Sequence, residues 1–122
     1  MNNKLKTGYF YLEQANKFSI IRVPKDIITG EIFSPLSLQA KLLYGLLIDR
    51  MTLSNRNRWL DEENRVYILY PVKEMQKDMG LSKRKIEECL MELDDFGLIV
   101  RKHQGNGRPN RIYVMNYAKR EK

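Results

Sequence analysis

The sequence predicts an α+β fold in which three helices pack beside a small antiparallel sheet, and three observations point to it. Residues 71–79 and 83–96 carry apolar side chains at helical spacing. Gly80–Leu81–Ser82 separates them with residues that end one helix and cap the next. Residues 98–114 follow as two extended runs around a glycine-rich turn. This succession is typical of a winged helix-turn-helix with a three-helix core and a three-stranded sheet that carries a basic wing.

Two runs rich in aromatic and β-branched residues begin the chain, Tyr9–Leu12 and Phe18–Val23. Residues 13–17 connect them, so we expect an N-terminal β-hairpin within an extension over residues 1–33. Such a segment exceeds what a small core needs, and two uses remain open. It packs against a second copy and forms a two-fold homodimer, or it folds as an arm onto its own domain.

The first helices are predicted from proline, glycine and apolar spacing. Pro24–Ile28 suits one helical turn that Gly30 closes. Ser34 with Pro35 marks the start of a helix over residues 36–51, which is apolar around nearly its whole circumference and therefore forms the buried spine.

The rest of the predicted winged-helix domain, residues 34–117, follows from strand patterns. Residues 52–64 are irregular, and residues 66–70 form a short strand that we expect to pair with the wing hairpin. Residues 118–122 are a charged tail, interpreted as a linker to a C-terminal domain that this chain lacks.

Charge and length favour a small intracellular protein with a polyanionic partner. The 122 residues are enough for one domain, and 22 Lys and Arg against 15 Asp and Glu give a net charge of +7, which makes nucleic acid the leading candidate. One cysteine, Cys89, fits a reducing compartment. Without an apolar export signal or membrane segment in the sequence, we expect a cytoplasmic protein.

The helix over residues 83–96 is the candidate recognition helix, because its first turn and a half carries cations on the outward face. Ser82 and the free N–H groups of this turn suit a phosphate. Arg84 is the candidate for a bidentate contact with guanine. For Glu88, two roles remain open: it accepts a hydrogen bond from cytosine, or it pairs with Arg84 and orients it.

The wing is basic over its whole length, and no acid lies between residues 96 and 118. Gly105–Asn106–Gly107 lets the backbone approach DNA, and Arg108 could enter a minor groove. Alternatively, the cations only protect a solvated hairpin edge from aggregation. The predicted DNA-contacting residues are Ser82, Lys83, Arg84, Lys85, Glu88, Arg101, Lys102, Asn106, Arg108 and Arg111.

The segments 36–51, 66–68, 80–85 and 97–99 resemble the N-terminal domain of the plasmid replication initiator protein A family. These are initiators of low-GC Gram-positive multiresistance and conjugative plasmids, and the resemblance covers nearly the whole chain. It implies binding to repeated double-stranded sequences (iterons) at a plasmid origin and dimeric or higher assembly on DNA. It also implies a DnaD-like helical C-terminal domain that recruits host replication proteins.

Catalysis has little support in the sequence, and we expect no enzyme, metal or cofactor. The chain has one histidine, His103, and no His/Cys cluster. Asp61–Glu62–Glu63 is interpreted as a solvated loop. Three functions remain: DNA binding by an initiator, DNA binding by a transcriptional repressor, or a winged-helix scaffold for protein interaction. The cations at residues 83–85 argue against the scaffold, and only the family resemblance favours an initiator over a repressor.

Overall fold

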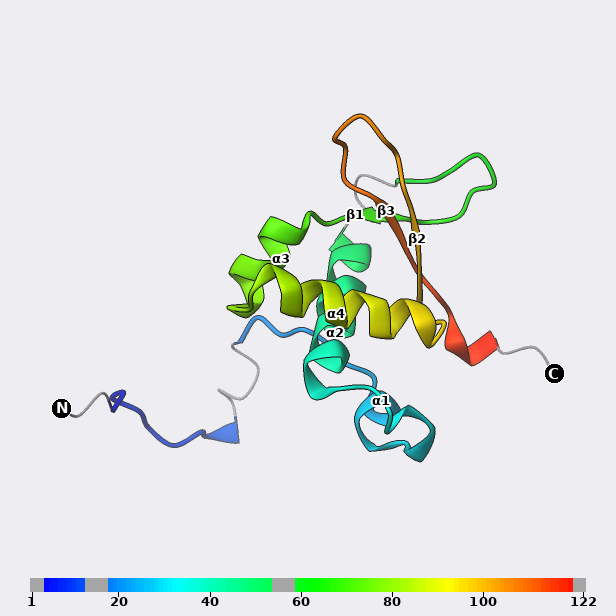
Figure 1. Ribbon diagram of the computed structural model, residues 1–122. Coiled ribbons are helices and arrows are strands. Elements are labelled where there is room, and N and C mark those ends of the chain that lie inside the picture. The colour runs from blue at the N-terminus through cyan, green and yellow to red at the C-terminus, as the bar shows by residue number, and fades with distance from the viewer. Residues whose placement is uncertain (1–3, 13–17, 54–58, 120–122) are drawn as a thin grey trace.

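Among the described residues, four helices and a three-stranded antiparallel sheet form the body of the protein, and the three longer helices with the sheet confirm the predicted fold class (Figure 1). The computed structural model describes residues 4–12, 18–53 and 59–119. The helices are α1 (Lys25–Thr29), α2 (Leu38–Leu53), α3 (Val72–Met79) and α4 (Lys83–Asp95), with short 3-10 turns η2 (Glu31–Phe33) and η4 (Tyr117–Lys119). The strands are β1 (Ile68–Leu69), β2 (Ile99–Lys102) and β3 (Arg111–Val114).

The helix-turn-helix of α3 and α4 forms where the sequence predicts it. Gly80 ends α3 in the left-handed conformation with φ 66°, which glycine adopts at little cost. The Lys85 N–H then donates to the Ser82 Oγ at 3.1 Å and so caps α4. Each helix turns one apolar face inward, and Met75 of α3 and Ile86 of α4 are both fully buried.

The spine helix α2 begins two residues later than predicted, because its cap is Ser37 and not Ser34. The Ala40 N–H donates to the Ser37 Oγ at 3.2 Å. Ser37 is itself fixed by Glu92 of α4, whose carboxylate accepts from the Ser37 N–H at 2.7 Å and from its Oγ at 2.8 Å. Ser34 instead ends the turn η2.

The hydrophobic core lies between α2, the α3–α4 pair and one face of the sheet. Its fully buried members include Leu43, Leu47, Ile68, Leu93 and Ile99. The prediction that α2 is buried around nearly its whole circumference is wrong. Its residues Leu38 and Leu42 are 62% and 42% exposed.

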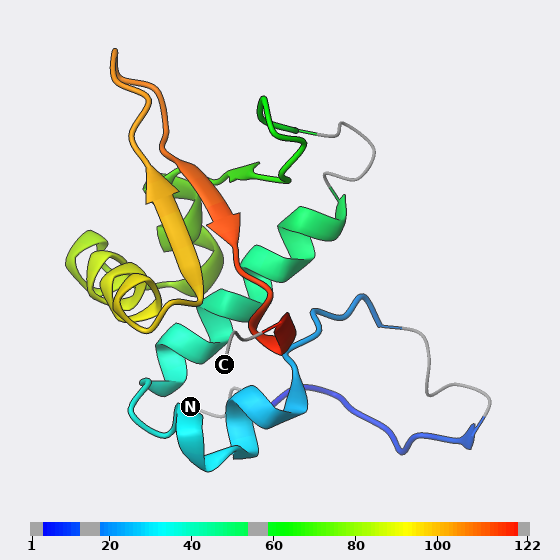
Figure 2. The same cartoon turned by 90° about the vertical axis from the view of Figure 1, so that its right-hand side faces the viewer.

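The sheet has the order β1-β3-β2, so the short strand pairs with the wing hairpin as predicted. β1 and β3 pair over only two positions, whereas β2 and β3 pair over four. β1 is shorter than the predicted strand 66–70, because Val66 pairs instead with Leu60 in an isolated bridge. The hairpin of β2 and β3 projects beyond the helices (Figure 2).

The predicted N-terminal β-hairpin is wrong for the residues that the structure describes. Residues 4–12 and 18–24 form no strand, and the first of these segments extends away from the body (Figures 1 and 2). The predicted connection at residues 13–17 lies outside the described residues. Tyr9 is 90% and Leu12 96% exposed, and the Phe10 ring packs edge-on against Phe18 with ring centroids 5.6 Å apart, so these β-forming residues are not part of a half-buried sheet. β-propensity reflects packing on a half-buried sheet, and an isolated hairpin is marginal in water.

Residues 25–33, which the sequence analysis placed in the N-terminal extension, contribute to the core. α1 forms at the predicted turn and buries Ile27 completely. The Phe33 ring packs against the rings of Phe96 and Tyr117, with centroids 5.8 and 5.3 Å away. The Tyr117 hydroxyl donates to Asp26 at 2.6 Å. Among the helices of the described segments, none is long and apolar enough to cross a lipid bilayer.

Candidate nucleic-acid interface

The first turn of α4 presents cations to solvent directly after its serine cap. Lys83 and Arg84 are exposed, the Arg84 side chain by 90%, and that of Lys85 is 36% exposed. Ile86 fills the inward position, so the three preceding side chains point around the outside of the turn. Backbone N–H groups in a first helical turn lack intrahelical acceptors and favour anions. The structure therefore brings Ser82 to Lys85 together as the sequence predicts.

Glu88 lies one turn further along α4 and contacts two of these cations. Its carboxylate is 3.4 Å from the Arg84 Nε and 3.6 Å from the Lys85 Nζ. The pairing with Arg84 that the sequence allows is thus present in the protein without DNA. An exposed pair at this spacing stabilises a helix by about 0.2–0.5 kcal/mol and holds the arginine along the helix.

A groove of about 580 Å³ separates the first turn of α4 from the wing. Apolar side chains such as Leu90 and Ile112 line part of it, and the turn before α3 borders it. Its lysine, arginine, histidine and acidic lining residues are Lys83 and Glu87 from α4, and Arg101, His103 and Arg108 from the wing. One cation beside one acid therefore lines the α4 wall, and two arginines line the wall formed by the wing.

The tip of the wing turns through three consecutive left-handed residues. Gly105, Asn106 and Gly107 have φ values of 74°, 55° and 72°. The Arg108 N–H donates to the Gly105 carbonyl at 3.0 Å and closes the turn. The Arg108 guanidinium also donates to the Gln104 carbonyl at 3.3 Å, from an exposed position. The predicted tip residues Asn106 and Arg108 thus lie together at the end of the projecting hairpin.

The four predicted wing cations do not share one face of the hairpin. Arg101 pairs in register with Ile112, whereas Lys102 pairs with Arg111. Cross-strand partners lie on the same face and neighbours along a strand on opposite faces. Arg101 therefore lies on the inner face with the buried Ile112 and lines the groove. Lys102 and Arg111 lie on the outer face, away from α4.

Arg101 is paired within the protein itself. Its Nε donates to the Asp94 carboxylate of α4 at 2.9 Å, and its side chain is only 27% exposed. This ion pair joins the wing to the recognition helix across the sheet edge. A phosphate in the groove would share Arg101 with Asp94.

On the outer face, aromatic rings and a glutamine hold the cations in place. The Arg111 guanidinium lies over the Tyr67 ring at 4.5 Å from its centroid, and its Nε donates to the Gln104 Oε1 at 3.2 Å. The Lys102 Nζ lies 5.6 Å from the centroid of Tyr113. Lys102, Gln104, Arg111 and Tyr113 border a second, more open hollow of about 350 Å³.

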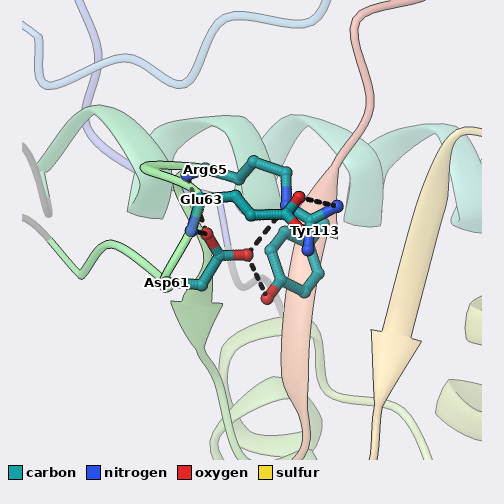
Figure 3. Close-up of polar contacts among 4 residues, drawn as sticks. All are labelled: Asp61, Glu63, Arg65 and Tyr113. Atoms are coloured by element: carbon teal, nitrogen blue, oxygen red, sulfur yellow. Dashed lines mark hydrogen bonds and ion pairs between the residues drawn. The ribbon is translucent and has the colours of Figure 1, made fainter.

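The acidic run Asp61–Glu62–Glu63 is not simply a solvated loop, because Asp61 is buried and makes polar contacts with Glu63, Arg65 and Tyr113 (Figure 3). The Asp61 carboxylate accepts from the backbone N–H groups of Glu63 and Arg65 at 2.8 and 2.9 Å. It also accepts from the Arg65 Nε and the Tyr113 hydroxyl, both at 2.9 Å. Burial by itself would raise the pKa of Asp61, but these hydrogen bonds outweigh it and hold the pKa below its usual range.

Sequence reasoning missed this cluster because only part of it is local. The i,i+4 spacing of Asp61 and Arg65 is a visible signal for the ion pair. Tyr113 is 52 residues away, and no local pattern connects it to the turn. In the described part of the chain, no three His, Cys, Asp or Glu side chains gather into a group that could hold a metal ion.

Comparison with known proteins identifies relatives of the whole domain. The model of the replication initiator protein A (RepA) N-terminus matches residues 19–122. The 41 kDa protein of Lactobacillus helveticus is 25% identical over 108 residues, which cover 84% of this chain and 31% of that protein. The chain thus spans about a third of the length of this curated relative.

Solved structures with the same fold are also similar in sequence. One, described as the N-terminal domain of a DNA-binding protein, has a TM-score of 0.72 and 29% identity, covering 91% of this chain and 85% of that one. A Rep–DNA complex has a TM-score of 0.72 and 29% identity, covering 89% of this chain and 84% of that one. An MDR initiator has a TM-score of 0.69 and 29% identity, covering 89% of this chain and 86% of that one. With its fold and most of its sequence matched in this way, the chain belongs to the family of replication initiator protein A (RepA) N-terminal domains.

Proposed function

We propose that this chain binds a specific double-stranded DNA sequence at the repeats of a plasmid origin and thereby initiates plasmid replication. The observation that carries the proposal is the basic first turn of α4, residues 83–85, from which Lys83 lines a groove whose other wall carries Arg101 and Arg108 of the wing. Family membership and the similarity to a Rep–DNA complex support it.

The geometry suits insertion of α4 into the major groove by its N-terminal end. The Arg84 side chain at that end is 90% exposed and carries the planar, two-pronged donor set that guanine accepts. Glu88, which contacts the Arg84 guanidinium, orients that side chain. Further along α4, Glu92 bonds to Ser37 and Asp94 bonds to Arg101, so both carboxylates face the protein. The first turn of α4 is therefore the part of the helix that would approach the DNA.

The groove between α4 and the wing accommodates one sugar–phosphate strand. Lys83 reaches it from α4, and Arg108 from the wing tip. With a strand seated there, the left-handed tip at residues 105–107 comes close to the adjacent minor groove, whose width and potential arginine reads. Phosphate contacts of this kind set register and affinity, and the base contacts of α4 set specificity.

The assembly and wider partners belong to the same proposal. The exposed apolar segment 4–12 is suited to contact a second copy of the chain, so a homodimer would bind two half-sites. Host replication proteins would be recruited by a further domain, since the curated relative is about three times as long as the matched region. Binding at a plasmid origin places the protein in the cytoplasm, and no catalytic step is assigned to it.

Selection of bound duplexes from a random pool tests the function directly, followed by footprinting across the chain's own coding region and upstream DNA. Tandem protected repeats that carry the selected sequence are expected. A single protected palindrome over a promoter would indicate a repressor instead. Failure to enrich any sequence would exclude specific DNA binding and favour a scaffold.

A further inference from the structure

The carboxylate of Asp61 lies outside the DNA-facing surface, yet it is fully buried and has donors on all sides. Its side chain has 0% exposure, and four hydrogen bonds from three residues reach it. A buried carboxylate is costly unless it is paired in this way. The arrangement makes the turn of residues 61–65 a rigid block, because two of the bonds come from the turn's own backbone.

The fourth bond joins this block to the wing. Tyr113 is in β3, on the outer face of the hairpin, and is 7% exposed. Its hydroxyl donates to Asp61, while Lys102 and Arg65 lie on its ring at 5.6 and 5.5 Å. Arg111, two residues before it on the same face, lies on the neighbouring Tyr67 ring.

The backbone alone attaches the wing weakly on this side. β3 pairs with β1 at two positions, Ile68↔Ile112 and Leu69↔Arg111, and the hairpin then projects freely. A bond from a rigid turn to the side chain after Ile112 restricts how far β3 can swing away from β1. The other tie of the wing, Arg101 to Asp94, lies on the opposite face.

We propose that Asp61 is a positioning residue for DNA binding: through the Tyr113 hydroxyl it sets the angle of the wing relative to α4. This rests on the proposed function. In the protein, the Asp61–Tyr113 bond braces the hairpin from outside while Arg101 and Asp94 brace it from inside. The width of the groove that receives the sugar–phosphate strand follows from these two ties.

Tyr113→Phe tests the proposal most cleanly, because it removes one hydroxyl and keeps the ring under Lys102. The matched control is Tyr117→Phe, which removes a tyrosine–aspartate bond of the same kind, to Asp26, after the end of β3 and outside the projecting hairpin. Asp61→Asn is the second test variant. The probe is a 30-base-pair duplex selected by the unaltered chain, together with its scrambled version, titrated from 0.05 to 0.2 M salt under conditions where every variant is folded.

Loss of one phosphate contact lowers the slope of log affinity against log salt by about 0.9. Across this fourfold range of salt, the affinity then falls about 3.5-fold less, and it falls about 12-fold less when two contacts are lost. For Tyr113→Phe, we expect the loss of affinity between 0.05 and 0.2 M salt to be about 3.5- to 12-fold smaller than for the unaltered chain. The preference for the selected over the scrambled duplex should be retained, because α4 is unchanged. Faster amide exchange is expected in residues 99–114, and Tyr117→Phe should change neither property.

An unchanged salt slope and unchanged exchange in Tyr113→Phe would overturn the proposal, as would an equal effect of Tyr117→Phe. If the unaltered chain selects no duplex, the proposed function fails instead. The exchange measurement then still decides whether Asp61 positions the wing.

Discussion

Replacing Arg84 with alanine separates base reading from phosphate binding at the recognition helix. The fold should tolerate the change, because the side chain is 90% exposed and its contact with Glu88 is a single 3.4 Å ion pair. Exposed i,i+4 pairs contribute about 0.3–0.5 kcal/mol to stability. A bidentate contact with guanine is worth about 1–3 kcal/mol of discrimination. The expected loss of specific affinity is therefore about 5- to 150-fold, with almost no change in melting temperature.

Arg84→Lys is the matched control for charge, because lysine keeps the positive charge and loses the planar two-pronged donor set. Fluorescence anisotropy on the selected duplex, on variants with each guanine replaced, and on a scrambled duplex would give the full comparison. We expect both substitutions to remove the preference for guanine at one position and to leave the salt slope nearly unchanged, because the slope counts phosphate contacts. Equal losses on selected and scrambled duplexes, with full recovery by lysine, would show that Arg84 contacts phosphate only.

Four further predictions concern the wing, the arm, the core and acid stability. Arg108→Ala should weaken DNA binding and lower the salt slope by roughly one unit; an unchanged slope would place the wing tip off the DNA. Deleting residues 1–12 should convert a dimer into a folded monomer in sedimentation; if the full and the shortened chain both sediment as folded monomers, also on DNA, the dimer is refuted. Gly45→Ala should destabilise the domain by about 1–3 kcal/mol, because its Cβ would lie 2.5 Å from the Val23 side chain; a higher melting temperature, which helix propensity alone predicts, would show that Val23 is not packed there. Because hydrogen bonding depresses the pKa of Asp61 in the folded state, its stabilising effect is complete above its unfolded value near 3.8 and is lost as the pH falls further. In urea unfolding, the difference in free energy of unfolding between the unaltered chain and Asp61→Asn should thus be constant from pH 6 down to about pH 4 and should narrow from there to pH 2. A difference that does not depend on pH would contradict this account.

The helix-turn-helix could be predicted from sequence because single residues set its boundaries. Pro71, Gly80 and Ser82 each act on their own backbone or on the next turn, and apolar spacing fixes the inward faces. The start of α2 could not be located in this way. Ser34 and Ser37 are equally good caps by type, and the choice is made by Glu92, 55 residues further along the chain.

The N-terminal runs Tyr9–Leu12 and Phe18–Val23 also show that local sequence alone does not decide which structure forms. Their residues favour strands, but a strand needs a sheet to pair with, and among the described residues, residues 4–12 form no strand and their large apolar side chains are mostly exposed. Residues 9–12 are therefore of types that favour strands, but the prediction that they form a strand is wrong.

The candidate site was predictable by residue type and less so by arrangement. Strand alternation already implies that Arg101 and Lys102 point to opposite faces, so their separation could have been anticipated. The bonds of Arg101 to Asp94 and of Tyr113 to Asp61 could not, because each depends on how distant elements pack.

The ion pairs that the acids of α4 make have a consequence for the search along DNA. Glu88 contacts Arg84 and Lys85, and Asp94 contacts Arg101, so a phosphate chain must compete with carboxylates already in place. Each such competition reduces the affinity for arbitrary sequence, which depends almost wholly on phosphate contacts. A cell offers on the order of 10⁶–10⁹ arbitrary sites. On the proposed function, a few internal carboxylates thus shorten the time the protein spends on each wrong site, and base contacts such as the one proposed for Arg84 determine where it remains bound.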